Sequence, residues 1–325
     1  MMAYIFRRIL YAIPILIGVN VLTFVLFFVV NSPDDMARMQ LGAKRVTDAA
    51  VESWKAERGY DLPLLINSKE KGIDQVTETI FFQKSASLFL FDFGRSDSGR
   101  DISYDIKQRM WPSLAIAIPS LIVGLLVNIS FALLIAFFRG TYLDFTGVVL
   151  CVILMSISGL FYIIGGQVLI GKLMNLVPIS GYDTGFEAVK FLILPVLVAL
   201  IGGIGSGTRW YRTIFLEEIG KDYIRTARSK GLSERLIMFK HVLKNAMIPI
   251  LTGVVVILPL LFMGSLITES FFGIPGLGSY TLDAITRQDF AIVRSMVFLG
   301  SVLYILGLLL TDISYTLVDP RVRLQ

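Results

Sequence analysis

Six long apolar runs constrain the fold of this chain more than any other feature. They cover residues 9–30, 112–138, 146–170, 189–208, 246–270 and 295–317. A helix needs about 20 apolar residues to cross roughly 30 Å of hydrocarbon, and the runs reach that length. Hydrophobic residues make up 55% of the 325 residues, so too little polar sequence lies between the runs to solvate six buried helices. The sequence therefore predicts an all-α integral membrane protein with six transmembrane helices.

The first run is predicted to be a retained membrane helix rather than a cleaved signal peptide. It follows Arg7 and Arg8, but it is longer than the apolar region of a signal peptide, and no small-x-small cleavage site follows it. The single cysteine, Cys151, lies in the third run. No internal disulfide is therefore possible, and no metal or redox site is indicated.

Positive charge is distributed unequally between the short loops. The loop at 209–245 carries nine Lys and Arg residues together with the only histidine, His241. The short loops on the other side carry little more than Lys172 and Arg287. Because cytoplasmic loops are enriched in Lys and Arg, this asymmetry predicts that the 209–245 loop and both termini are cytoplasmic.

The segment between the first two runs is predicted to form an extracytoplasmic subdomain. Thr47 is expected to cap a helix over 48–58 that ends at Gly59, and a further short helix is expected over 101–108. The resulting organisation has three parts: the cytoplasmic N-terminus and first membrane helix (1–30), the extracytoplasmic subdomain (31–111), and a five-helix core with its cytoplasmic loop at 209–245 (112–325).

The cytoplasmic loop, between the fourth and fifth spans, has the pattern of a docking element. Residues 222–229 are expected to be helical, Gly231 to allow a turn, and Ser233 to cap a second helix. That helix has one apolar stripe, with spacings of four, three and four residues, formed by Leu232, Leu236, Phe239 and Leu243. Such a helix can insert its apolar face into a groove on a partner. The alternative is a basic loop that only fixes orientation or contacts anionic lipid.

This loop, with the sequence DYIRTARSKGLSER at 222–235, resembles the EAA loop of bacterial ABC importer permeases. The Ala-x-x-x-Gly core of that loop is matched by Ala227 and Gly231. Thr226 and the residues at 241–244 depart from the general loop in ways that are usual in the oligopeptide, dipeptide and nickel branch. Further segments resemble the B-type permease subunit of that branch: FRRILYAIPILIGVNVLTF (6–24), FDFGRS (91–96), RGTYLDF (139–145), ESFFGIPGLGSYTLDAITRQDF (269–290) and DISYTLVDPRVRL (312–324).

The resemblance implies one half of the transmembrane pathway of an ATP-driven importer for short peptides, working by alternating access in the bacterial inner membrane. The implied partners are a second, homologous permease, two ABC ATPase subunits that bind ATP and Mg²⁺, and an extracytoplasmic solute-binding protein. The residues expected to couple this chain to the ATPases are Ala227, Gly231, Leu232, Glu234, Leu236 and Phe239. The chain itself is expected to bind no cofactor, metal or nucleic acid.

No catalytic pattern is present. GGIGSGTR at 202–209 has glycines at the Walker A spacing, but Thr208 and Arg209 replace the Lys-Ser/Thr that would hold phosphate and Mg²⁺. Close helix packing through small residues is the expected role of this segment. The chain has no His-Glu-x-x-His or Gly-x-Ser-x-Gly motif, which argues against a membrane protease. A permease for nickel or another small solute and a stand-alone secondary carrier remain as alternatives.

Polar residues within the apolar runs are candidates for lining a translocation path. Such residues are unfavourable in hydrocarbon and tend to face the bundle interior or a cavity. The candidates are Asn128, Gln167, Ser265 and Glu269. For Asn128 and Gln167, hydrogen bonds between helices are an equally simple explanation.

Overall fold

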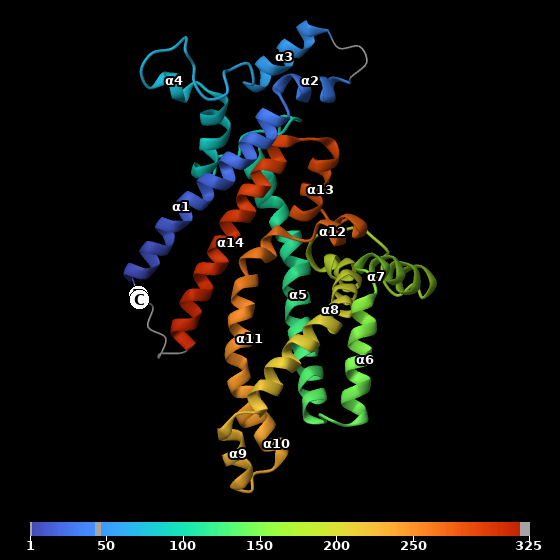
Figure 1. Cartoon of the computed structure of the whole chain (residues 1–325). Helices are drawn as coiled ribbons and strands as arrows, with labels where there is room; N and C mark the ends of the chain where they lie inside the picture. The colour runs from blue at the N-terminus through green and yellow to red at the C-terminus, as the bar shows by residue number, and fades with distance from the viewer. Residues whose placement is uncertain (1, 43–46, 319–325) are drawn as a thin grey trace. The chain divides into compact units, whose positions relative to one another are not determined.

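The computed structural model describes residues 2–42 and 47–318, and these residues form helices almost throughout (Figure 1). Among them the only β-type pairing is an isolated bridge between Arg95 and Asp101. The chain divides into two compact units. The first contains residues up to 108 together with 281–305, and the second contains 109–280 together with the described residues from 306 onward. Of the sequence DISYTLVDPRVRL (312–324), residues 312–318 belong to the last described helix and residues 319–324 lie outside the described residues.

The first unit is built from the N-terminal helix and the short helices that follow it. They are α1 (Met2–Phe24), η1 (Val25–Val30), α2 (Pro33–Leu41), α3 (Asp48–Arg58), α4 (Asp74–Thr77), η2 (Phe81–Ser85) and η3 (Ala86–Leu90), with the first residues of α5 (Ile102–Phe137), the end of α13 (Leu277–Arg287) and most of α14 (Phe290–Val318). Figure 1 shows α2 and α3 beside the C-terminal end of α1. Their common core includes Phe24, Phe28, Met36, Trp54 and Tyr60.

The helix expected over 48–58 forms with the predicted ends. The Thr47 hydroxyl accepts a hydrogen bond from the amide of Ala50, which satisfies a donor of the first helical turn. Gly59 follows the helix with a left-handed φ of 66°. Both capping predictions are confirmed. The helix expected over 101–108, by contrast, is not separate, because it forms the first turns of α5 and the helix continues through Pro112.

The second unit contains the remaining helices. They are α6 (Tyr142–Ser156), α7 (Gly159–Gly166), η4 (Gln167–Leu173), η5 (Gly185–Glu187), α8 (Ala188–Ile219), α9 (Asp222–Ser229), α10 (Glu234–Leu236), η6 (Ile237–Leu243), α11 (Lys244–Ile257), η7 (Pro259–Met263) and α12 (Leu266–Phe272). The segment GGIGSGTR lies inside α8, not after a strand. A Cβ at Gly205 would come within 2.5 Å of the Cys151 carbonyl oxygen. The expected role of this segment in close helix packing is thus confirmed.

Five helices in the described residues are long and apolar enough to cross a membrane: Phe6–Val30, Ile102–Phe137, Gly185–Ile219, Glu234–Met263 and Phe290–Ser314. The run at 146–170 does not form one straight span. It forms the pair Tyr142–Ser156 and Gly159–Leu173, bent by 87°, because Ile157 and Ser158 adopt extended backbone angles. The expected number of six spans is reached if this pair counts as one.

The run at 246–270 also differs from its expected extent. The helix that contains it begins at Glu234 and ends at Met263. Gly264 then adopts a φ of 67°, which breaks the helix, and Ser265 begins a new one. Ser265 and Glu269 therefore lie beyond the span and not within it.

Candidate functional site

The loop expected at 209–245 is mostly helical. Residues 209–219 are the last turns of α8, and the helix that starts at Glu234 continues without interruption into α11. The second helix of the loop is therefore not separate, as expected from the sequence, but forms the first turns of the long helix that contains the next apolar run. Only α9 stands as an independent short helix, and Figure 1 shows α9 and α10 together at the end of α8 and α11.

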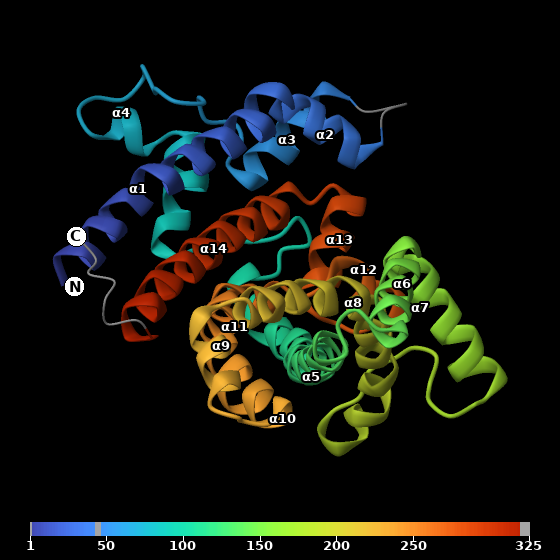
Figure 2. The ribbon, with the colours of Figure 1, turned by 60° about the horizontal axis from the view of Figure 1, so that its bottom comes forward.

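One face of α9 is buried against the long helices around it. Ile224 is completely buried and Ala227 is 6% exposed. Both belong to a cluster with side chains of α5, α8, η6 and α11, among them Phe215 and Ile237. Figure 2 shows the same arrangement from another side, with α9 and α10 beside α8 and α11. A small residue at position 227 lets α9 approach this core, which explains the alanine of the Ala-x-x-x-Gly pattern.

The glycine of that pattern ends α9. The amide of Leu232 donates to the Ala227 carbonyl oxygen at 3.3 Å, and the amide of Gly231 donates to that of Arg228 at 2.9 Å. These two bonds define a Schellman motif, which requires a left-handed residue after the helix. Gly231 supplies it with a φ of 76°. No atom lies within 4 Å of a Cβ placed at Gly231, so backbone conformation rather than space selects glycine here.

Ion pairs lie at both ends of α9. The Arg228 guanidinium contacts both carboxylate oxygens of Glu234, with Nε–Oε1 at 2.7 Å and Nη2–Oε2 at 3.2 Å. At the other end of α9, Glu218 accepts hydrogen bonds from Lys221 at 2.5 Å and from the Tyr223 hydroxyl. Burial, followed by the bond to Glu218, raises the pKa of Tyr223 to about 12.

Only part of the apolar stripe predicted for this loop is packed against the buried cluster. Leu232 and Leu243 pack partly against the buried cluster, whereas Leu236 is 43% and Phe239 63% exposed. The side chains that anchor this helix are Ile237, Met238 and Val242, which are at most 3% exposed and lie off the predicted stripe. Ser233 precedes α10 as expected, although its side chain makes no capping hydrogen bond. Leu236 and Phe239 thus form an exposed apolar face beside a rigid turn.

Two of the path candidates hydrogen-bond to other segments of the second unit. The Thr208 hydroxyl donates to Asn128 Oδ1 at 3.0 Å, which joins α8 to α5, and Asn128 is 8% exposed. The Gln167 side-chain amide donates to the carbonyl oxygens of Ile179, at 3.2 Å, and Phe271, at 2.9 Å. Both amides therefore have partners within the chain.

Glu269 is a buried carboxylate of the second unit with several hydrogen-bond donors around it. It is 1% exposed and accepts hydrogen bonds from the Ser113 hydroxyl at 2.8 Å, the Ser265 amide at 3.1 Å and the Ser279 amide at 3.0 Å. Burial raises the pKa of Glu269, and the bonds to Ser279, Ser113 and Ser265 oppose that rise. Ser265, the fourth path candidate, is exposed, and its hydroxyl caps α12.

No group of three or more His, Cys, Asp or Glu side chains that could hold a metal ion is present within residues 2–42 and 47–318. The loop combines an exposed apolar face, exposed cations and a turn whose left-handed residue is a glycine.

Two family profiles match this chain. The family described as binding-protein-dependent transport system inner membrane component matches residues 128–324, and its N-terminal counterpart matches residues 1–85. The loop and the path candidates all lie within the first match.

Curated relatives match over nearly the whole length. The oligopeptide transport system permease protein AppB of Bacillus subtilis is 30% identical over 99% of this chain and 100% of its own length. A putative peptide transport system permease protein of Brucella abortus is 32% identical, with 99% of each chain covered. The glutathione transport system permease protein GsiC of Salmonella choleraesuis is 31% identical with the same coverage. This chain is therefore a multi-pass inner membrane protein that belongs to the family of binding-protein-dependent transport system inner membrane components.

Proposed function

We propose that this chain is the permease subunit of an ATP-driven ABC importer for short peptides. The relatives described above are named for oligopeptides, peptides and glutathione, which favours peptides over nickel or another small solute. The chain has no Walker A motif, so ATP and Mg²⁺ bind to partner ATPase subunits and not to this chain.

The observation that carries this proposal is the exposed apolar face of the α9–α10 loop. Leu236 and Phe239 lie beside a Schellman turn whose conformation is fixed by Gly231 and by the Arg228–Glu234 pair. A rigid element with exposed apolar side chains at its centre and cations around it fits a groove on a partner protein. A stand-alone secondary carrier has no ATPase subunit to which such a face could dock.

The proposed complex contains two homologous permeases, two ATPases and an extracytoplasmic binding protein. Each ATPase receives one docking loop, and closure of the ATPase pair moves the attached spans, which gives alternating access. Docking to a cytoplasmic ATPase places the α9–α10 loop and both termini in the cytoplasm, in agreement with the nine cations between 209 and 244.

The path candidates differ in what they offer to a substrate. Asn128 and Glu269 are buried and already bonded, so their contacts are explained without a substrate. Ser265 and Gln167 retain accessible surface, and we propose these two as the path-lining residues.

The test is the ATPase rate of the co-expressed complex in lipid, with and without binding protein and a pool of short peptides. We expect peptide and binding protein together to stimulate hydrolysis. Gly231→Val should reduce the stimulation by about tenfold, because a β-branched residue in the left-handed region costs about 1–2 kcal/mol.

Gly231→Asn is the matched control, because asparagine tolerates the same backbone angles. It should retain most of the stimulation. If no ATPase subunit copurifies with the chain, or if both Gly231 variants couple normally, the docking role of the loop is refuted and the secondary carrier is favoured.

A further inference from the structure

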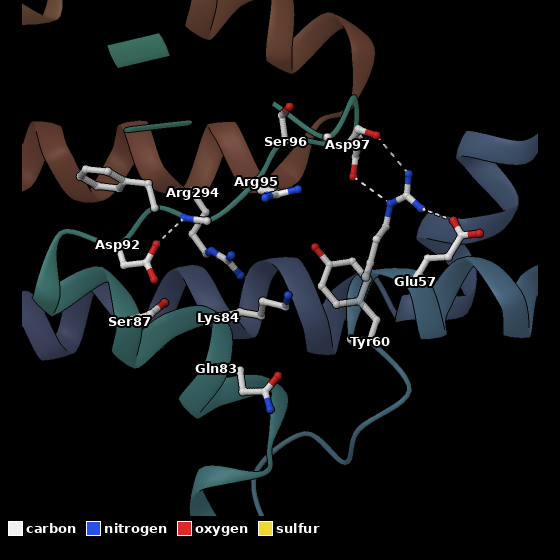
Figure 3. A pocket seen from close by; sticks show the side chains of 16 residues that line it. Glu57, Tyr60, Gln83, Lys84, Ser87, Asp92, Arg95, Ser96, Asp97 and Arg294 are labelled. Carbon is white, nitrogen blue, oxygen red and sulfur yellow. Dashed lines mark hydrogen bonds and ion pairs between the residues drawn. The ribbon is translucent and has the colours of Figure 1, made fainter. Parts of the chain in front are cut away.

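A pocket of about 650 Å³ lies within the first unit, and no step of the proposed function uses it. Its walls come from the end of α3, from η2, from the segment before α5 and from α14 (Figure 3). A volume of this size is typical of sites for small ligands. Most of the lining side chains are polar or charged, which suits a small polar ligand better than an acyl chain.

Arg294 is a buried cation in this pocket that lacks an anionic partner. It is 4% exposed, and its Nε has no hydrogen-bond partner. None of the ion pairs between described residues includes it, and its guanidinium lies 5.2 Å from the ring centre of Phe28. A buried charge without a counter-ion is strongly unfavourable, and one cation–π contact compensates only part of that. The site therefore attracts an anion.

Two further donors surround the same space. The Lys84 ammonium lies 5.5 Å from the ring centre of Tyr60 and is paired with no described carboxylate. Burial, followed by the charge of Arg294, lowers the pKa of Lys84. Figure 3 shows the Lys84 ammonium, the Arg294 guanidinium and the Tyr60 hydroxyl directed toward one space. All three groups can donate hydrogen bonds to the oxygens of one anion.

The acidic residues of the pocket are not arranged to neutralise these cations. Asp97 Oδ1 accepts a hydrogen bond from Arg58 Nε at 3.2 Å, so this carboxylate already has a partner. Asp92 accepts one from the Gly94 amide at 3.1 Å and is exposed. The Glu57 side chain is 70% exposed and contacts Arg58, with Nη1–Oε2 at 3.5 Å. The pocket thus combines two cations that have no carboxylate partner with the accessible carboxylate of Asp92.

We propose that this pocket binds a short zwitterionic peptide. Arg294, Lys84 and the Tyr60 hydroxyl hold its terminal carboxylate, while the exposed carboxylate of Asp92 is available to its ammonium group. This inference rests on the proposed function, because it assigns the peptide a subsite on the permease itself. An anionic lipid headgroup would meet the same cations, but the accessible Asp92 carboxylate and the scarcity of apolar lining residues disfavour it.

The test is calorimetric binding of trialanine and of trialanine amide to the complex in phosphatidylcholine nanodiscs, without binding protein. Trialanine should bind, and its C-terminal amide should bind at least tenfold more weakly, because it lacks the carboxylate. Arg294→Gln should weaken trialanine binding at least tenfold. Arg38→Gln, which removes a half-exposed arginine outside the pocket, is the matched control and should leave binding unchanged.

Thermal unfolding without peptide separates a binding role of Arg294 from a structural one. Removal of an unpaired buried charge should leave the unfolding temperature of Arg294→Met unchanged or raised. A lowered unfolding temperature together with unchanged trialanine affinity would overturn the proposal. If the Arg294 variants do not assemble, Lys84→Gln replaces them, with the same expected loss and the same refuting result.

Further outcomes of these experiments distinguish a wrong ligand for the pocket, a wrong pocket assignment and a wrong proposed function. If phosphatidylglycerol nanodiscs abolish trialanine binding and stabilise the wild type but not Arg294→Gln, the pocket holds a lipid headgroup and the proposal is wrong. If Arg294→Gln binds trialanine normally while peptides still stimulate ATP hydrolysis, the pocket assignment alone fails. If no peptide stimulates hydrolysis by the wild-type complex, the proposed function itself fails.

Discussion

The α9–α10 loop and the pocket of the first unit leave opposite kinds of groups unsatisfied. In the loop, the acidic side chains of Glu218, Asp222 and Glu234 each contact a cation, whereas large apolar side chains remain exposed. In the pocket, the aromatic side chains of Tyr60 and Phe93 are buried, whereas Arg294 and Lys84 contact no described carboxylate and Arg294 Nε has no hydrogen-bond partner.

This difference indicates the kind of partner that each region requires. Exposed apolar surface on a rigid helical turn is covered best by another protein, because burial of that surface provides the free energy of binding. Unpaired donors in a small pocket are satisfied best by a small anion. Each of the following predictions tests one side of this comparison.

The largest expected effect concerns a buried charge that, unlike Arg294, has its partners. Glu269→Gln should lower the free energy of unfolding by about 3 kcal/mol, because the new amide group faces N–H or O–H donors at either oxygen position and leaves one of them without an acceptor. Thermal unfolding of the purified chain measures this loss.

Glu70→Gln, at an exposed position, is the control and should change stability by less than about 0.5 kcal/mol. Equal stability of the Glu269 and Glu70 variants would mean that buried charge in this chain needs no partners. Burial of Arg294 would then be no indication that this residue needs an anionic partner.

A second prediction concerns the exposed face of the loop. Phe239→Ser should weaken association with the ATPase subunit by about 2 kcal/mol, or roughly thirtyfold, and leave thermal stability almost unchanged, because Phe239 is exposed in the free chain. Titration of purified ATPase subunit against the chain in nanodiscs provides the measurement.

Phe186→Ser is the control for this variant, since Phe186 is 97% exposed and lies outside the loop. It should bind the ATPase as the wild type does. If the two serine variants bind with equal affinity, Phe239 is not part of the docking surface.

The smallest effect is expected for the charge pair across the turn. Arg228 and Glu234 are 34% and 54% exposed, so their coupling should be about 0.5 kcal/mol near neutral pH. Protonation of the Glu234 carboxylate removes its charge, so this contribution should be lost in strong acid. A double-mutant cycle with Arg228→Gln and Glu234→Gln, repeated at acidic pH, measures it. A coupling that persists in strong acid would contradict the assignment.

Local signals in the sequence predicted the capped helix of the first unit correctly. Thr47 and Gly59 act within one turn of the helix ends that they define, so distant residues do not alter their effect. The break at Ile157 had a comparable signal, because Ser158-Gly159 is a common turn pair, but the high hydrophobicity of the surrounding run obscured it.

The loop shows why periodicity alone failed to predict the buried face. The stripe through Leu236 and Phe239 assumed 3.6 residues per turn. The structure has a π-helical segment over Ile237–Leu243, in which hydrogen bonds span five residues and the helix is wider. The faces therefore rotate, and Ile237, Met238 and Val242 become buried.

The pocket depends on contacts between distant segments, which no local pattern reveals. Arg294 lies just before the expected span at 295–317, and α14 in fact begins at Phe290, which places Arg294 inside the helix. An ionisable residue within a span is a sign of a functional site. Arg294 was not predicted as such a residue, because the predicted span began at residue 295, five residues after the start of α14.

The central claim is that the exposed face of the α9–α10 loop contacts the ATPase subunit. Because Cys151 is the only cysteine, a Cys151→Ala background allows a single cysteine to be placed at Phe239, or at Phe186 as the control. Treatment of the assembled complex with a short bifunctional maleimide, against an ATPase subunit that carries cysteines along its permease-facing groove, then reports the contact. We predict a cross-linked product from Phe239→Cys and none from Phe186→Cys. The absence of a product from Phe239→Cys at every groove position in an assembled complex would contradict the claim.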